Sequence, residues 1–86
     1  PSMPETAYEQ VDQQLNQTYQ ALQTVLSESE QAQLTDVQQT WLRYRDANCD
    51  YEVNYADTVI SETQCLARMS ETRVYQLQAQ LDQWSL

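Results

Sequence analysis

The sequence Trp41-Leu42-Arg43-Tyr44-Arg45-Asp46 decides the fold of this chain, together with Cys49, Cys65-Leu66 and Arg73 further along. With Arg68, this part of the chain contains both cysteines, all 4 positive charges and one of the 2 tryptophans. A guanidinium, a carboxylate or an indole is costly to bury unless it has a partner. We therefore expect these residues to specify how the elements pack. By themselves they do not indicate a reaction.

Composition favours a single helical domain covering residues 1–86. The chain has no Gly and no Phe, and its only prolines are Pro1 and Pro4. A β-rich fold needs several tight turns, which depend on Gly, Asn and Asp at positive φ. The lack of Gly also excludes the Gly-rich phosphate loops of common nucleotide-binding proteins.

The charge balance narrows the choice of partner. Thirteen acidic residues face 4 arginines, with no His, for a net charge of −9. Nucleic acid and anionic membrane surfaces are bound by clustered cations, so both are poor partners. A basic protein would be attracted, although acidity also simply keeps a small domain soluble. No apolar run approaches the roughly 20 residues of a membrane helix.

Apolar spacings of three and four residues predict three helices. The first spans about Glu5 to Leu26. The second follows Ser27, whose spacing to Glu30 is typical of a capping box, with Ser29 as the competing cap. It ends at about Val53 or Asn54. The third spans about Val59 to Gln83, with Asp57 or Thr58 as the cap. Short links predict antiparallel neighbours.

The two cysteines test this arrangement. Cys49 and Cys65 are equally distant in sequence from Asp57, so an antiparallel hairpin turning there brings them level. We therefore predict an all-α, antiparallel three-helix domain with one disulfide between the second and third helices. The disulfide would close a loop of about 15 residues, worth about 3 kcal/mol. It implies an oxidising compartment, and two cysteines without His make a zinc site a poor alternative.

The same construction predicts a polar seam. Turning the first hairpin at Ser29 brings Asp12 level with the Arg45-Asp46 pair, where its carboxylate would pair with Arg45, and brings Asn16 level with Trp41 or Leu42. Across the second hairpin Arg73 is level with Trp41 and can stack on its ring. We expect a structural seam formed by Asp12, Asn16, Trp41, Arg45 and Arg73. The alternative is a pocket for an anionic ligand.

Six tyrosines are too many for a small core, so some must be exposed. Tyr44, Tyr51 and Tyr55 are the candidate partner-binding residues, because Tyr is preferred at the centres of protein interfaces. We expect no catalytic, metal-binding or cofactor-binding residues. There is no His to act as a base, and the cysteines are expected to pair. Asp50, Glu52 and Asp57 lack the spacing and the Gly of a calcium loop.

An ordered set of motifs resembles the LprI-like lysozyme-inhibitor domain from about Tyr8 to Leu77. The set comprises Leu15-Asn16-x-x-Tyr19, Leu34, Gln38, Trp41-x-x-x-Arg45-Asp46-x-x-Cys49, Cys65-Leu66 and Thr72-Arg73. The resemblance implies a small helical bacterial domain, secreted or periplasmic, that in some members inhibits lysozyme. Two features depart from the family: an additional N-terminal cysteine is absent, and Tyr55-Ala56-Asp57-Thr58 replaces a Gly-Ser-containing link.

Two functions follow. The first is an extracytoplasmic binding protein that inhibits lysozyme, which as a basic protein would be attracted to this acidic chain. The alternative is a cell-envelope structural or assembly module that acts through homo- or hetero-oligomer contacts. A concentration series in the analytical ultracentrifuge separates them, because a tight homodimer favours assembly. An enzyme is not expected.

Overall fold

The computed structural model describes residues 3–55 and 60–85. Three α-helices account for nearly all of them: α1 is Met3–Val25, α2 is Glu28–Asn54 and α3 is Glu62–Asp82, followed by a single 3₁₀ turn, η1, at Gln83–Ser85. The described residues form no strand. The predicted all-α fold with three helices is therefore confirmed.

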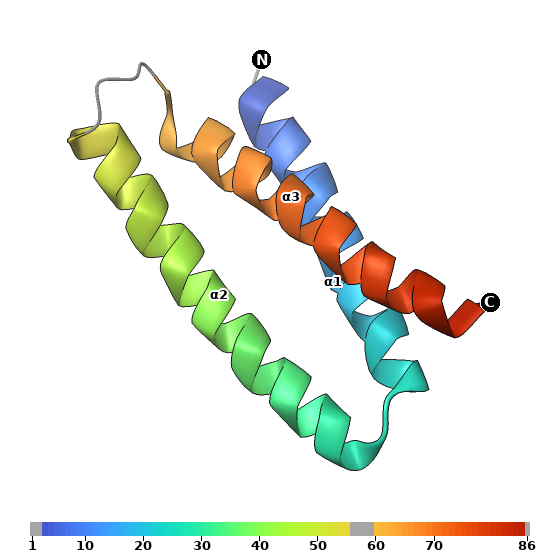
Figure 1. Cartoon of the computed structure of the whole chain (residues 1–86). Coiled ribbons are helices and arrows are strands. Elements are labelled where there is room, and N and C mark those ends of the chain that lie inside the picture. Colours follow the sequence, from blue (N-terminus) through green and yellow to red (C-terminus); the bar gives the residue numbers. More distant parts are fainter. Residues whose placement is uncertain (1–2, 56–59, 86) are drawn as a thin grey trace.

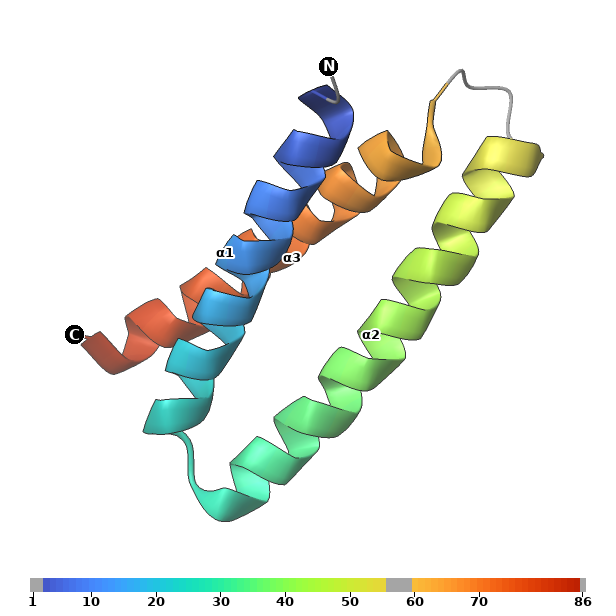
Figure 2. The same cartoon turned by 180° about the vertical axis from the view of Figure 1, so that it is seen from behind.

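Successive helices run in opposite directions, so α1 and α3 run in the same direction (Figure 1). α3 crosses α1 and packs closely along it, while α2 lies to one side of this pair (Figure 2). A tight link at Leu26 and Ser27 joins α2 to α1. At the other end of α2, Cys49 and Cys65 form a disulfide to α3 with a Cα–Cα distance of 5.6 Å. The predicted disulfide is confirmed.

A small apolar core lies between the three helices. Leu15 and Leu22 of α1, Leu34 of α2, and Val74 and Leu77 of α3 are buried together. Partly buried side chains complete this core from all three helices, namely Tyr19, Leu26, Trp41 and Leu81. Leu15, Tyr19 and Leu22 of α1, and Val74, Leu77 and Leu81 of α3, recur at the spacings of three and four residues that are typical of an apolar helical stripe.

Two capping boxes fix where α2 and α3 begin. Ser27 is the N-cap of α2: its side chain accepts from the Glu30 N–H, and the Glu30 carboxylate accepts from the Ser27 N–H. Ser61 and Gln64 make the same reciprocal pair at α3. The third helix therefore starts later than predicted. The sequence S-x-x-Q is a recognisable capping box that the prediction overlooked. The predicted caps, Asp57 and Thr58, lie outside the described residues.

No helix in residues 3–55 and 60–85 combines the length and the apolar character needed to cross a membrane.

Candidate functional site

Two buried arginines share one tryptophan ring at the middle of the fold. The guanidinium carbon of Arg45 lies 5.5 Å from the centre of the Trp41 ring, and that of Arg73 lies 5.8 Å from it. Both arginines are more than nine-tenths buried. We call Trp41, Arg45 and Arg73 the arginine–tryptophan cluster. The predicted proximity of Arg73 to Trp41 is present, and the negative face of the indole stabilises a cation above it.

Arg45 has a full set of partners. Its Nε and Nη2 lie 3.0 and 2.9 Å from Oδ1 of Asp46, which is mostly exposed. Its Nη1 donates to Oγ of the fully buried Ser70 on α3 at 3.3 Å. The Tyr8 ring of α1 lies 5.8 Å from the guanidinium. Arg45 thus connects all three helices, and its charge is balanced by its neighbour in sequence.

The predicted ion pair between Asp12 and Arg45 is wrong, because the first hairpin turns two residues earlier than assumed. The Tyr19 hydroxyl lies 3.1 Å from Thr35 Oγ1, and Gln31 Nε2 donates to the Gln23 carbonyl at 2.8 Å. Both pairs are symmetric about Ser27, not Ser29. This change shifts every facing pair by about one helical turn, so that Tyr8 takes the position beside Arg45 that was predicted for Asp12.

Asp12 and Asn16 consequently lie away from the cluster. They line a hollow of about 180 Å³ between α1 and α2, where Asn16 is level with Gln38 and not with Trp41. The remaining lining residues are Leu15, Tyr19, Thr35, Gln39 and Leu42. Of the five predicted seam residues, the structure brings together Trp41, Arg45 and Arg73.

Arg73 is bound less completely than Arg45. Its Nε donates to Gln38 Oε1 at 3.0 Å and its Nη1 donates to Gln76 Oε1 at 3.1 Å. Both acceptors are neutral amides. Nη2 is shielded from solvent and has no hydrogen-bond partner. Burial of this guanidinium lowers the pKa of Arg73 from its ordinary value, because desolvation disfavours the charged form.

A hollow of about 440 Å³ opens beside Arg73, between α2 and α3. Its walls are Val37, Trp41 and Tyr44, with Asp36 and Thr40 on the same helix and Arg73 contributed by α3. We call this the Arg73 hollow. Its surface is largely apolar, and among the described residues that line it the guanidinium is the one cationic group.

The three candidate tyrosines form an exposed ridge along the C-terminal half of α2 and its C-cap. Tyr44, Tyr51 and Tyr55 expose 59%, 55% and 78% of their surface. Tyr44 and Tyr51 are seven residues apart and lie on one face of α2, and Tyr55 is the C-cap residue directly after the helix. The rings of Tyr51 and Tyr55 stack with centres 6.3 Å apart. We call these residues the tyrosine ridge. Its Tyr44 end also forms a wall of the Arg73 hollow.

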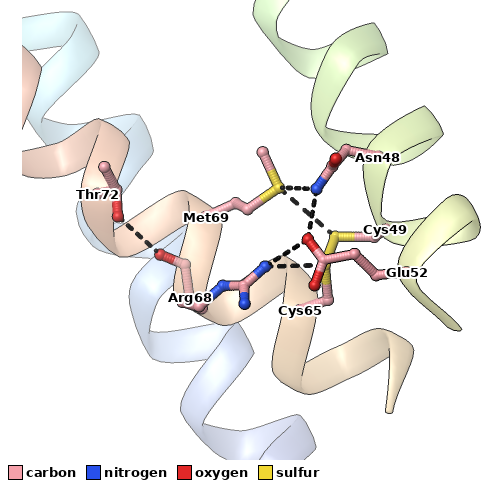
Figure 3. A network of polar contacts seen from close by, with 7 residues as sticks. All are labelled: Asn48, Cys49, Glu52, Cys65, Arg68, Met69 and Thr72. Atoms are coloured by element: carbon pink, nitrogen blue, oxygen red, sulfur yellow. Dashed lines mark hydrogen bonds and ion pairs between the residues drawn. A yellow bond between two sulfur atoms is a disulfide. The ribbon is translucent and has the colours of Figure 1, made fainter. Parts of the chain in front are cut away.

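A polar network surrounds the disulfide near the C-terminal end of α2 (Figure 3). Glu52 accepts hydrogen bonds of 2.6 Å from Arg68 of α3 and from Asn48. The Arg68 hydrogen bond, with a smaller contribution from Asn48, lowers the pKa of Glu52 from its ordinary value. Met69 lies over the disulfide, with its sulfur 3.8 Å from Cys49 Sγ. This network reinforces the crosslink between α2 and α3.

The described residues do not support a cation site formed by Asp50, Glu52 and Asp57, the acidic residues considered in the sequence analysis. Glu52 is committed to Arg68, and Asp57 lies outside the described residues. Within residues 3–55 and 60–85, no three acidic or cysteine side chains group in a way that would hold a metal ion.

Sequence reasoning missed Gln38, Ser70 and Gln76, the neutral partners of the two arginines. The signal for Gln38 was available. Gln38 lies four residues after Leu34, three before Trp41 and seven before Arg45. The apolar pattern alone favoured Val37 for the buried side of the second helix, and Val37 is half exposed. The role of Ser70 depends on how α2 and α3 pack against each other, whereas Gln76 follows Arg73 by three residues on α3, a spacing at which helical side chains are neighbours.

The arginine–tryptophan cluster, both cysteines and the tyrosine ridge all lie within residues 3–77, which match the family model of lysozyme inhibitor LprI. The chain belongs to the lysozyme inhibitor LprI family. The resemblance read from the motifs is thus confirmed. The family is one of inhibitors and not of enzymes. No curated protein and no solved structure matches this LprI-family chain.

Proposed function

We propose that this domain is an extracytoplasmic binding protein that inhibits lysozyme. The observation that carries the proposal is the match of residues 3–77 to an inhibitor family. The disulfide supports an oxidising compartment, since such bonds persist outside the cytoplasm and are rare within it.

The tyrosine ridge is the proposed contact surface. Tyrosine provides a large, rigid area at low entropic cost and is enriched at the energetic centres of interfaces. The ridge lies on a helix that also exposes Asp36, Asp46 and Asp50. A basic partner would be steered by the field of the whole chain and then held by the aromatic side chains.

The experiment is a lysis assay with a basic lysozyme at about 0.15 M salt, where the Debye length is about 8 Å. Slowed lysis that persists at this ionic strength indicates a specific contact, because purely electrostatic association weakens steeply with salt. The disulfide is first confirmed by mass, as the oxidised chain lacks two hydrogens.

We expect the double variant Tyr51→Ala, Tyr55→Ala to inhibit at least about tenfold more weakly, corresponding to about 1.4 kcal/mol. Tyr75→Ala is the matched control. Tyr75 is 69% exposed but lies on α3, so its loss should leave inhibition unchanged. Equal effects of the two variants would contradict the ridge. Absence of inhibition by the oxidised wild type would contradict the function, and a tight homodimer in the ultracentrifuge would favour the assembly module.

A further inference from the structure

Among the described residues, Arg73 is the buried cation that has no anionic partner. Arg45 has Asp46 and Arg68 has Glu52, whereas in the described residues Arg73 has only two neutral amide oxygens. It exposes 8% of its surface, and its Nη2 has no partner. A buried cation normally pairs with an anion, because desolvation is repaid only by a charged or fully hydrogen-bonded partner.

The unused donor belongs to a side chain that lines the Arg73 hollow. Val37, Trp41 and Tyr44 form its walls, and Val37 and Tyr44 are themselves more than half exposed. The volume of about 440 Å³ falls within the range of pockets that take small ligands or single side chains. Apolar walls around one guanidinium suit a ligand with an apolar stem and an anionic end.

We propose that the Arg73 hollow binds a carboxylate on an apolar stem, namely an acidic side chain of the bound protein partner, which completes the coordination of Arg73. The carboxylate accepts from Nη2, and its stem lies against Trp41 and Tyr44. The assignment to a protein partner rests on the proposed function and on the position of Tyr44, which belongs both to the hollow and to the tyrosine ridge. The ligand chemistry itself does not depend on which partner carries it.

Two local features define how such a ligand enters. Nη2 is shielded in the free protein, so a carboxylate reaches it only after neighbouring side chains rearrange. Asp36 also lines the hollow, and its negative charge opposes an incoming anion. We therefore expect Asp36→Asn to strengthen binding, which a ligand held by apolar contact alone would not show.

The direct test uses butyrate, whose four carbons correspond to the side chain of glutamate together with its Cα, and butyramide as its neutral counterpart. In ¹H–¹⁵N spectra at constant ionic strength, we expect butyrate to shift the Trp41 indole N–H and the Arg73 Nε–H saturably, in the millimolar range. The Trp84 indole N–H is an internal control, since Trp84 lies on η1 and does not line the hollow. Butyramide should produce no saturable shift. Equal shifts by the two compounds, or none by butyrate, would overturn the inference.

The variant Gln38→Glu provides a second test, and we expect it to keep the native fold. Gln38 Oε1 already accepts from Arg73 Nε, so a carboxylate at this position supplies the missing negative charge from within. We expect Gln38→Glu to raise stability and to weaken butyrate binding by about tenfold or more. Gln39→Glu changes the net charge equally on an exposed site and should bind like wild type. Unchanged binding by Gln38→Glu would overturn the proposal.

The same pair of variants separates this inference from the proposed function. If Gln38→Glu inhibits lysozyme less than Gln39→Glu, both the site and its use against lysozyme are supported. If butyrate binds as expected but wild type does not inhibit lysozyme, the site is retained and the proposed partner fails. If wild type inhibits lysozyme but butyrate does not bind, the proposed function is retained and the inference about the hollow fails.

Discussion

At the scale of single residues, Trp41 allows two arginine side chains to be buried close to each other in a small domain. Arg45 and Arg73 both lie within 6 Å of its ring centre, although like charges in a region of low dielectric repel. The ring offsets part of this cost through its negative π surface. Asp46 balances one cation, and the amides of Gln38 and Gln76 hold the other in place without neutralising it.

Trp41→Leu should therefore lower the free energy of unfolding by more than the loss of buried apolar area alone would. Leucine keeps the apolar character of the position but forfeits both cation–π contacts, at about 1 kcal/mol each. We expect a loss of about 2 kcal/mol or more in the free energy of unfolding, measured in urea. Trp84→Leu is the control: Trp84 is half exposed, so its replacement should change stability by about 0.5 kcal/mol at most. Equal effects of the two substitutions would rule out this role for Trp41.

At the scale of helices, the choice between two serines sets the register of the first hairpin. Ser27 and Ser29 both precede the apolar stripe of α2, and only Ser27 forms the reciprocal bonds with Glu30. The Ser27 N–H, which donates to the Glu30 carboxylate, is the main cause of the lowered pKa of Glu30. The cap ends the turn from α1, so it also determines which residues of the two helices face each other.

Ser27→Ala should lower the free energy of unfolding by about 1 kcal/mol, because it leaves an N–H at the start of α2 without its partner. Ser29→Ala provides the matched control, since Ser29 is exposed within the first turn and is not the cap. We expect that variant to be as stable as wild type, or slightly more stable, given the higher helix propensity of alanine. Thermal unfolding followed by circular dichroism distinguishes them. A larger loss for Ser29→Ala would move the cap and with it the hairpin register.

These two serines also show what the sequence could predict. Periodicity gave the number of helices, the disulfide and most of the core, because each depends on spacing along one helix or across one hairpin. The Asp12 pairing failed because the hairpin centre was taken at Ser29, and a small shift of the centre moves a facing pair by one turn. The bond from Arg45 to Ser70 was out of reach, since it depends on how α2 and α3 pack against each other. The bond from Arg73 to Gln76 was overlooked, because side chains three residues apart on one helix are neighbours.

At the scale of the whole molecule, α2 is the least embedded helix. α3 packs closely along α1, and α2 is joined to this pair at Ser27 and at the disulfide (Figure 2). The tyrosine ridge and one wall of the Arg73 hollow both belong to α2. The proposed binding surfaces therefore lie on the helix whose position depends most on its two attachments. A disulfide near the end of α2 restrains this helix without requiring a larger apolar core, which suits a chain of only 86 residues.

The double variant Cys49→Ala, Cys65→Ala should destabilise the packing of α2 more than that of α1 and α3. The chain-entropy model assigns about 3 kcal/mol to a loop of about 15 residues, a large share of the total stability of a small domain. We expect hydrogen exchange to accelerate most in the half of α2 after Arg45, where only the disulfide network holds the helix. Amides in the middle of α1 and α3 should be affected less, because these helices pack directly on each other. Wild type treated with reductant is the control, and its hydrogen exchange should likewise accelerate more in the second half of α2 than in α1 and α3. Uniform acceleration across all three helices would mean that α2 unfolds together with the core, and that the disulfide stabilises the domain as a single cooperative unit.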